Sequence, residues 1–264
     1  MIVWHNGEWK EEDEACLRID GGFLRGEGVF ETMLGLQGRV FAKQAHWERL
    51  ARGLECFGLE GIDEQSFKCL SEEVLERNRF LPDERVRVRV TVSEGHVLIS
   101  AVPEVIHWEP LTLATAPYVR NERSALVGLK AISYAENSLA LRWGRSQGAH
   151  EVLFANTRGH WCEGSWSNIF AVKEGRVFTP PLGSGCLPGV TRSLVIDLAR
   201  DQGVETCEEE KEPAWLQAVD EIFLTSSLRG VVPVGRFDET LFPTGPLTQM
   251  LAVELQRLER QGVD

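Results

Sequence analysis

Residues 161–192 read WCEGSWSNIFAVKEGRVFTPPLGSGCLPGVTR, and two features of this stretch guide the interpretation of the whole chain. It begins with a strand pattern that carries one acid, Glu163, among small and apolar neighbours. It ends in a glycine-rich loop that runs into a helix pattern, LPGVTRSLVIDLA. Because the first backbone N–H groups of a helix have no partner inside the helix, such a start is an anion site that phosphate often occupies. The stretch therefore predicts a small molecule that needs both an acid and a phosphate cradle.

The composition limits the classes of protein to which this chain can belong. The chain has 264 residues, 43% of them hydrophobic, and a formal net charge of −12. This length suits one large domain or two moderate ones with an ordinary globular core. The negative charge disfavours nucleic acid and anionic membrane, because both need a basic face. The chain start lacks a signal-peptide pattern, and no apolar run approaches the roughly 18–20 residues that span a bilayer.

The six cysteines are scattered along the chain, without a CxxC pair and without a histidine at zinc-ligand spacing. This pattern is typical of reduced thiols in a cytoplasmic protein. We therefore expect a cytoplasmic location, no metal site, and neither a nucleic-acid nor a membrane partner.

The first hundred residues predict a sheet with two helices on one side. Strand alternation occurs in residues 2–4, 8–10, 29–34, 39–41 and 86–103. Residues 42–60 and 66–80 carry apolar side chains at helical spacing. Gly22, Gly26 and Gly28 imitate a dinucleotide-binding fingerprint, but a strand pattern follows them where that site needs a helix. We expect an α+β domain over residues 1–115.

An interdomain linker is predicted at residues 116–123, and a C-terminal α/β domain at residues 124–264. Helix patterns in this second domain cover residues 134–145, 190–200, 213–219 and the segment from Leu247. Strand patterns cover residues 151–155, 161–172, 177–179, 204–207, 221–225 and 231–234.

Two side chains each allow two interpretations. Lys130 lies between Leu129 and Ala131, so it is either a lysine whose stem covers apolar surface or a desolvated amine suited to Schiff-base formation. Glu163 either faces solvent from its strand or is buried beside a cation of a ligand. Taken alone, each residue favours the solvent-facing interpretation.

Further residues suit a phosphate. Val190 and Thr191 lie at a helix start, where they offer backbone N–H groups, although Thr191 is equally an ordinary N-cap. Ser226 and Ser227 follow a strand and offer hydroxyl groups. Arg49 is either a solvated helix arginine or a charge-assisted phosphate contact. A reactive amine, an acid for a ring nitrogen and a phosphate site are together what pyridoxal 5'-phosphate needs.

Five segments, in order along the chain, can be compared with the sequences of a known family. They are GGFLRGEGVFET (residues 21–32), HWERL (46–50), LKAISYAEN (129–137), the stretch from EVLFANTRGH to LPGVTR (151–192) and DEIFLTSSLRGVVPV (220–234). In these segments the chain resembles the fold-type IV, or class IV, pyridoxal-phosphate enzymes. That family includes branched-chain and D-amino-acid aminotransferases and aminodeoxychorismate lyase. The resemblance implies a two-domain fold of the D-amino-acid aminotransferase type, with the cofactor at the domain interface and most of its site in the C-terminal domain. It also implies a homodimer.

The resemblance implies a role for each candidate. Lys130 would form the Schiff base and move the proton, and Glu163 would bind the pyridine nitrogen. Leu187 would pack against one face of the ring. The phosphate would be held by Arg49, Val190, Thr191, Ser226 and Ser227.

The reaction has three alternatives. Thr32 stands where aminodeoxychorismate lyase has a threonine near its reacting groups, which favours pyruvate elimination to give 4-aminobenzoate. The second alternative is an aminotransferase acting on branched-chain amino acids, D-amino acids or amines. The short turn at residues 93–96 lacks the arginine-and-histidine carboxylate trap of the D-amino-acid enzymes. The third is a non-catalytic cofactor-binding protein. Candidate partners of a substrate carboxylate are Arg25, Arg87, Arg89 and Arg229.

Overall fold

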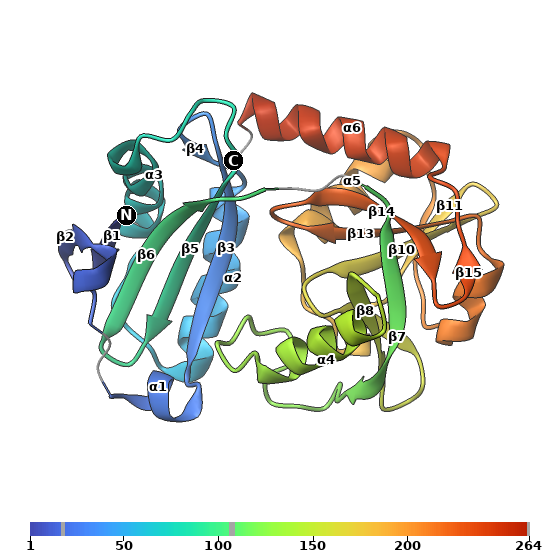
Figure 1. Cartoon of the computed structure of the whole chain (residues 1–264), viewed down its shortest axis with the longest axis horizontal. Helices are drawn as coiled ribbons and strands as arrows, with labels where there is room; N and C mark the ends of the chain where they lie inside the picture. The colour runs from blue at the N-terminus through green and yellow to red at the C-terminus, as the bar shows by residue number, and fades with distance from the viewer. Residues whose placement is uncertain (17–18, 106–108, 263–264) are drawn as a thin grey trace. The chain divides into compact units, whose positions relative to one another are not determined.

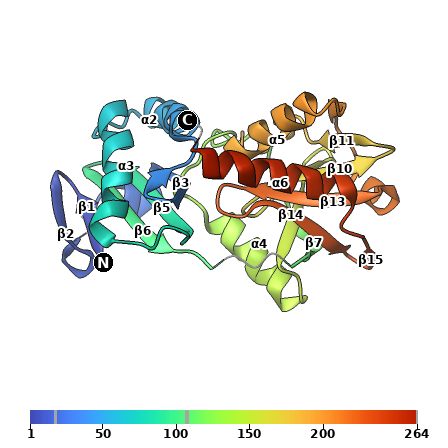
Figure 2. The same cartoon turned by 90° about the horizontal axis from the view of Figure 1, so that it is seen from above.

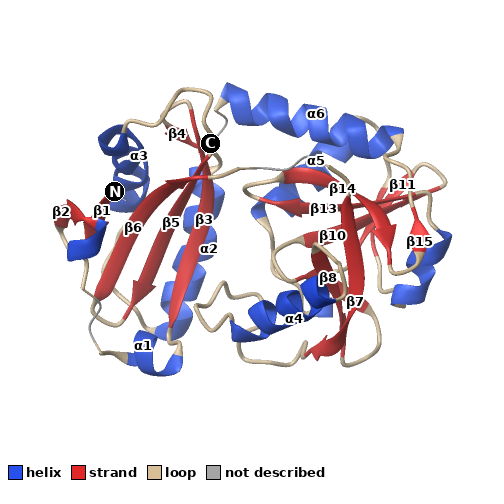
Figure 3. Ribbon diagram, in the orientation of Figure 1, coloured by secondary structure: helices blue, strands red, loops and turns tan. Residues whose placement is uncertain are grey.

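The chain forms two compact units in a computed structural model that describes residues 1–16, 19–105 and 109–262 (Figure 1). The first unit comprises Met1–Ile106, Leu129–Tyr134 and Leu258–Asp264. The second comprises His107–Gly128 and Ala135–Arg257. Each unit has its own sheet and its own helices, as Figure 3 shows in red and blue. This agrees with the expected two-domain α+β class.

The first unit is built on an antiparallel six-stranded sheet with the order β2-β1-β6-β5-β3-β4. Its strands are β1 (Ile2–His5), β2 (Glu8–Glu11), β3 (Gly28–Leu36), β4 (Arg39–Val40), β5 (Val86–Ser93) and β6 (His96–Pro103). Two neighbouring helices, α2 (Lys43–Phe57) and α3 (Glu64–Asn78), pack on one face of this sheet (Figure 2). The prediction of a sheet with two helices on one side is therefore confirmed.

Strand alternation divides this sheet into two different faces. In β5 the valines at positions 86, 88, 90 and 92 are all buried in the core against α2 and α3. The intervening Arg87, Arg89 and Thr91 point to the other face, because successive side chains of a strand alternate. In β3, Val29 and Met33 belong to the same core, so Phe30 and Thr32 lie on the face that the helices leave uncovered.

One short helix of the first unit was not predicted from the sequence. Helix α1 (Gly21–Arg25) follows the 3-10 turn η1 (Glu12–Glu14) and fills part of the segment between β2 and β3. Asp20 caps it, because its side chain accepts a hydrogen bond from the Phe23 N–H at 2.9 Å. Gly26 ends it with a left-handed backbone at φ 72°.

The second unit contains a mixed nine-stranded sheet with the order β12-β11-β10-β13-β14-β7-β8-β9, and β15 pairs with β14. The strands are β7 (Leu111–Arg120), β8 (Glu151–Asn156), β9 (Trp161–Gly164), β10 (Asn168–Lys173), β11 (Arg176–Thr179), β12 (Thr206–Glu208), β13 (Glu221–Ser226), β14 (Gly230–Phe237) and β15 (Thr240–Leu241). Helix α4 (Ala135–Ser146) packs on β7 and β8, and α5 (Val190–Asp201) packs on β12 and β13. The 3-10 turns are η2 (Leu182–Ser184) and η3 (Pro213–Ala218), and α6 (Pro246–Gln261) is the last helix.

Three predictions for this half of the chain were wrong. Much of the linker predicted at residues 116–123 belongs to β7, because Val119 and Arg120 still pair with β8. The single strand predicted at residues 161–172 is two strands, β9 and β10, with a bend between them. Residues 213–218 form a 3-10 helix rather than an α-helix.

Within the described ranges, no helix combines the length and the apolar character that crossing a membrane requires. The same part of the chain holds no group of three or more His, Cys, Asp or Glu residues arranged for a metal ion.

Candidate active site

The predicted site residues divide between the two units. Thr32, Arg49 and Lys130 belong to the first unit. The second unit contains Glu163, Leu187, Val190, Thr191, Ser226 and Ser227.

Lys130 lies beside the beginning of β3. Ala131 forms an antiparallel bridge with Val29, and the Phe30 N–H donates to the Lys130 carbonyl at 2.9 Å. This pairing brings the Lys130 ammonium to 4.4 Å from the centre of the Phe30 ring and 5.5 Å from that of Tyr134. The half-buried amine therefore lies against two aromatic rings, an environment that attracts a cation.

Thr32 and Arg89 occupy the same face of the sheet as Phe30. Thr32 is the direct cross-strand partner of Arg89. The Arg89 guanidinium lies 3.8 Å from the centre of the Phe30 ring, and its Nε donates to the Thr91 hydroxyl at 3.0 Å. Burial lowers the pKa of Arg89. Lys130 and Arg89 thus both contact the Phe30 ring, and Thr32 lies on the same sheet face as the cross-strand partner of Arg89.

Arg89 differs from the neighbouring arginines in its charge partners. Arg87 forms an ion pair with Glu104 at 3.6 Å, and Arg25 with Glu27 at 2.7 Å. For Arg89, none of the ion pairs among the described residues supplies a carboxylate. A buried cation is costly unless an anion compensates it.

Arg49 is buried in α2, so its interpretation as a solvated helix arginine was wrong. Its Nε and Nη2 donate to the two carboxylate oxygens of Glu31 on β3, each at 2.7 Å. His46 Nδ1 lies 2.7 Å from Glu31 Oε2. Burial, the largest single influence, would raise the pKa of Glu31, but the Arg49 charge and the contacts with His46 together outweigh it and hold that pKa well below its usual range. Phosphate binding by Arg49 stays a prediction.

Glu163 lies in β9 with only 9% of its surface exposed, so the solvent-facing interpretation was wrong. Its Oε2 accepts a hydrogen bond from the Leu187 N–H at 2.8 Å. Its Oε1 lies 3.4 Å from Nη2 of Arg120, a residue that the sequence analysis did not select. The acid is therefore tied directly to the loop that precedes the predicted phosphate cradle.

The cradle begins at Gly189, which is the N-cap of α5 and provides no side-chain cap. Val190 and Thr191 are the first two helical residues, and both are buried. The alternative that Thr191 is an ordinary N-cap was therefore wrong. A Cβ atom at Gly189 would collide with the Asn168 side-chain oxygen, so the glycine permits this close approach.

Asn168 connects the parts of the site in the second unit. Its Nδ2 donates to the Leu187 carbonyl at 2.9 Å. In the sheet it is the cross-strand partner of Thr225, the residue before Ser226 and Ser227. The asparagine thus holds the loop beside the end of β13. In the sequence, only its place in the segment EGSWSN (residues 163–168) could have indicated that Asn168 belongs to the site.

The bend between β9 and β10 is built around Glu151. This buried carboxylate accepts hydrogen bonds from the N–H groups of Ser165 and Trp166, at 3.0 and 3.2 Å. It also accepts from the hydroxyls of Ser165 and Ser167. The bend ends one strand just after Glu163 and starts the next at Asn168.

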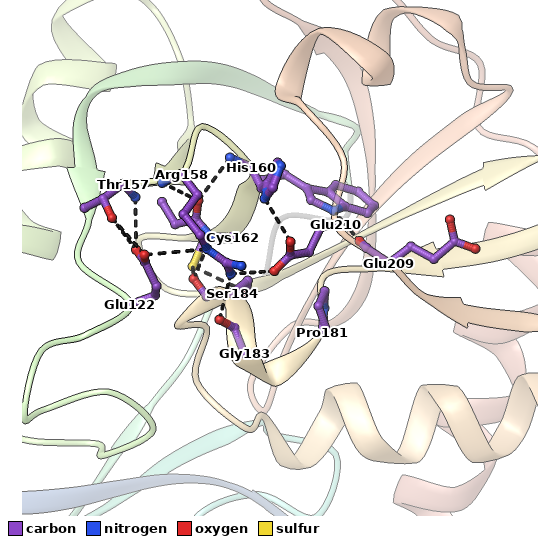
Figure 4. A network of polar contacts seen from close by, with 12 residues as sticks. Glu122, Thr157, Arg158, His160, Cys162, Pro181, Gly183, Ser184, Glu209 and Glu210 are labelled. Carbon is purple, nitrogen blue, oxygen red and sulfur yellow. Dashed lines mark hydrogen bonds and ion pairs between the residues drawn. The ribbon is translucent and has the colours of Figure 1, made fainter.

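A second polar network supports the part of the loop that precedes Leu187 in the sequence (Figure 4). Glu122 accepts hydrogen bonds from the Thr157 N–H at 3.1 Å and from its hydroxyl at 2.8 Å. Arg158 pairs with Glu122 at 3.6 Å and with Glu210, and donates to the Gly183 carbonyl at 3.0 Å. The turn after β8 is thereby linked to η2, a few residues before Leu187.

The sequence model of the family described as amino-transferase class IV matches residues 28–237. The chain belongs to this family. Its members use pyridoxal 5'-phosphate as their cofactor.

Three known proteins illustrate the similarity. A Thermotoga maritima protein named probable branched-chain-amino-acid aminotransferase is 33% identical, with 95% of this chain and 93% of the relative covered. Aminodeoxychorismate lyase of Bacillus subtilis is 31% identical, with 90% and 87% covered. The crystal structure of a branched-chain aminotransferase from Thermoproteus uzoniensis with norvaline has a TM-score of 0.92 and 29% identity, covering 99% of this chain and 96% of the other.

Taken separately, each unit has residues that suit pyridoxal phosphate. The N-cap of α5 leaves the first N–H groups of the helix without a side-chain cap, as a phosphate site requires. Glu163 is a buried carboxylate suited to a protonated ring nitrogen, and Lys130 supplies an amine.

Proposed function

We propose that the protein is a 4-amino-4-deoxychorismate lyase, which eliminates pyruvate and leaves 4-aminobenzoate. The observation that carries the proposal is that Lys130 and Arg89 both contact the Phe30 ring, while Thr32 is the cross-strand partner of Arg89 on the same sheet face. This arrangement places an amine, a hydroxyl and a cation with no carboxylate partner among the described ion pairs on one face of the first unit. A substrate with both an ionisable C–H bond and a carboxylate suits these three groups.

The cofactor, when bound, supplies an electron sink that stabilises negative charge on the substrate carbon. The Lys130 amine would hold the cofactor until the substrate amine replaces it, and the released Lys130 amine would then accept the proton that leaves the substrate ring. The bond between the ring carbon and the enolpyruvyl oxygen breaks, and the departing enolpyruvate takes up a proton to become pyruvate. The proton lost by the ring and the proton gained by pyruvate balance.

In the second unit, Glu163 would accept the N–H of the pyridine ring and keep the ring nitrogen protonated. The Val190 and Thr191 N–H groups would bind the phosphate, together with the hydroxyls of Ser226 and Ser227. Leu187 would contact one face of the ring. Arg49 would add a positive charge for the phosphate from the first unit.

Thr32 and Arg89 would act on the substrate. The Thr32 hydroxyl would orient the reacting groups beside the Lys130 amine, and Arg89 would bind a substrate carboxylate. Because charged groups are buried at low cost only when they are paired, a half-buried arginine without an ion pair among the described residues favours an anionic ligand. Arg89 is thus preferred over Arg25 and Arg87, which have ion pairs, and over Arg229, which is exposed.

The second candidate is an aminotransferase acting on branched-chain amino acids, D-amino acids or amines. The names of the Thermotoga maritima relative and the Thermoproteus uzoniensis structure favour it. In that reaction Lys130 would pass the proton to the cofactor. A non-catalytic cofactor-binding protein is disfavoured, because both Lys130 and Glu163 are present.

A paired assay separates the two reactions. The holoenzyme is given 4-amino-4-deoxychorismate alone, and pyruvate and 4-aminobenzoate are measured. It is then given amino acids with keto acids, and amino-group exchange is measured. Release of both products in equal amounts supports the lyase. Exchange without pyruvate release contradicts the lyase and establishes the aminotransferase, and Lys130→Ala should abolish either reaction.

The role of Lys130 has its own test. Borohydride reduction of the holoenzyme should attach the cofactor covalently to the peptide that contains Lys130, with loss of its visible absorbance. A label on another lysine would disprove the assignment. We also propose a homodimer, which light scattering of the purified protein tests directly.

A further inference from the structure

Arg120 is the last residue of β7, and its side chain is only 15% exposed. The guanidinium lies 4.5 Å from the centre of the Phe154 ring. Nη1 donates to Glu136 and, at 3.4 Å, to the side-chain oxygen of Asn137 on α4. Nη2 lies 3.4 Å from Oε1 of Glu163. Arg120 therefore lies between an exposed carboxylate and the buried carboxylate of the site.

The two oxygens of Glu163 have different neighbours. Oε2 accepts the Leu187 N–H at 2.8 Å, whereas Oε1 lies beside Arg120. Burial favours the neutral form of a carboxylic acid, and an adjacent cation favours the charged form. The charge of Arg120 therefore opposes the effect of burial on Glu163.

We propose that Arg120 is a positioning residue for the cofactor-binding acid. It keeps Glu163 ionised and oriented before the cofactor binds, and it limits the basicity of Glu163 afterwards. The second effect matters because a more basic carboxylate would take the proton from the ring nitrogen. The proposal rests on the assignment of Glu163 to the ring nitrogen, and it applies equally to a lyase and to an aminotransferase.

The other titratable groups around this pair do not replace Arg120. Burial raises the pKa of the Cys162 thiol, and it raises that of Cys186 to about 11, so both thiols are neutral near pH 7. Glu136 is 48% exposed and carries the same sign as Glu163. Asn137 is uncharged and donates to the Ser165 carbonyl at 2.7 Å.

Contacts within the second unit hold Arg120 in place without a ligand. The Phe154 ring supports the guanidinium plane, and arginine stacks on aromatic rings better than lysine does. Glu136 and Asn137 bind the Nη1 side of the fork. The Nη2 side is thereby directed to Glu163 in the apoprotein as well as in the holoenzyme.

The test measures the dissociation constant of pyridoxal phosphate for the refolded apoprotein between pH 5.5 and 8.5. The charge is removed in Arg120→Gln and Arg120→Met, and it is kept in Arg120→Lys. The ratio of the variant constant to the wild-type constant at each pH cancels the titration of the cofactor itself. The control is Arg200→Met, which removes an exposed arginine paired with Asp197.

Loss of the Arg120 charge should raise the pKa of Glu163, so the acid becomes protonated as the pH falls. We expect the ratio for the two neutral variants to be larger at pH 5.5 than at pH 8.5, by up to about tenfold. Arg120→Lys and the control should keep a ratio that does not change with pH. A ratio that is independent of pH in the neutral variants would overturn the proposal, because a merely structural defect predicts that result.

A double variant completes the test. In a Glu163→Gln background, Arg120→Gln should add no further pH dependence, because the group that it acts on is absent. Additional pH dependence in the double variant would show that Arg120 acts elsewhere and would contradict the proposal. If Arg120→Met does not fold by circular dichroism, Arg120→Gln, which keeps a hydrogen-bonding side chain, decides the outcome. A wild-type apoprotein that does not bind pyridoxal phosphate would instead contradict the proposed function.

Discussion

Glu31 on β3 and Arg49 on α2 are joined by two hydrogen bonds of 2.7 Å in the interior of the first unit. The fork of the guanidinium matches both oxygens of the carboxylate, which is the strongest geometry for such a pair. The pair fixes the position of α2 on the sheet. Because the opposite face of β3 carries Phe30 and Thr32, it also fixes the strand on which the candidate chemistry lies.

Replacement of Glu31 by glutamine should strongly destabilise the protein. The substitution removes the carboxylate charge that pairs with the buried Arg49, which costs about 3–5 kcal/mol in free energy of unfolding. Urea denaturation at pH 7.5 measures the loss. The matched control is Glu64→Gln, because Glu64 pairs with Lys68 on the surface of α3 and its loss should change little. Equal effects of the two substitutions would contradict the role of the buried pair.

The stability of the protein should fall as the pH is lowered from 7 to 4. Burial lowers the pKa of His46, so below its ordinary value of about 6.5 the unfolded chain binds a proton that the folded protein refuses. The folded-state pKa of Glu31 is also lowered, so its stabilisation is complete above about 4.3 and declines at lower pH. Both groups therefore act in the same direction.

Denaturation midpoints at pH 8, 6.5, 5.5 and 4.5 measure this trend, and His46→Gln should reduce the decline between pH 6.5 and 5.5. A wild-type stability that increased over that interval would refute the assignment of a neutral buried His46.

Gly189→Ala should weaken cofactor binding. The new Cβ would collide with the side chain of Asn168, so either the start of α5 or the asparagine must move. Such overpacking typically costs about 1–3 kcal/mol, and we expect the dissociation constant of pyridoxal phosphate to rise roughly tenfold or more. Gly183→Ala in the same loop is the control, because a Cβ there meets no atom within 4 Å. The idea fails if both variants bind the cofactor equally well.

Arg89→Met should raise the KM for a carboxylate-bearing substrate while leaving cofactor affinity unchanged. Loss of one partner of a buried charge pair costs about 2–5 kcal/mol, which corresponds to an increase in KM of roughly 30-fold or more. Arg89→Lys should recover part of this loss. Arg87→Met is the control, because Arg87 lies on the same strand and already pairs with Glu104. An unchanged KM in Arg89→Met would exclude the residue from substrate binding.

Strongly periodic segments could be predicted from the sequence. The alternation of valine with arginine and threonine in residues 86–92 identified a strand with one buried face, because the period of two leaves no other arrangement. The turn chemistry of LPG before an apolar helical pattern likewise located the start of α5. Helix α1 had comparable signals in Asp20 and Gly26, but only five residues separate them.

The remaining features depend on contacts between distant segments. Alternation could not show that β9 is buried on both faces, so the burial of Glu163 became clear only from the fold. The bend between β9 and β10 is set by Glu151, more than ten residues earlier in the chain. Arg120 lies where a linker was expected, and only the pairing of β7 with β8 brings it to the acid.

The position of Asn168 has a consequence for how this family diversifies. Because this one side chain holds the Leu187 loop beside the end of β13, the proposed contacts of Glu163, Val190 and Thr191 with the ring and phosphate are assembled within the second unit. The proposed substrate contacts, Thr32 and Arg89, lie on a sheet face of the first unit. Substitutions on that face can therefore redirect the reaction while the contacts in the second unit are retained. Relatives of similar identity carry the names of an aminotransferase and of a lyase, which is what this proposed separation would allow.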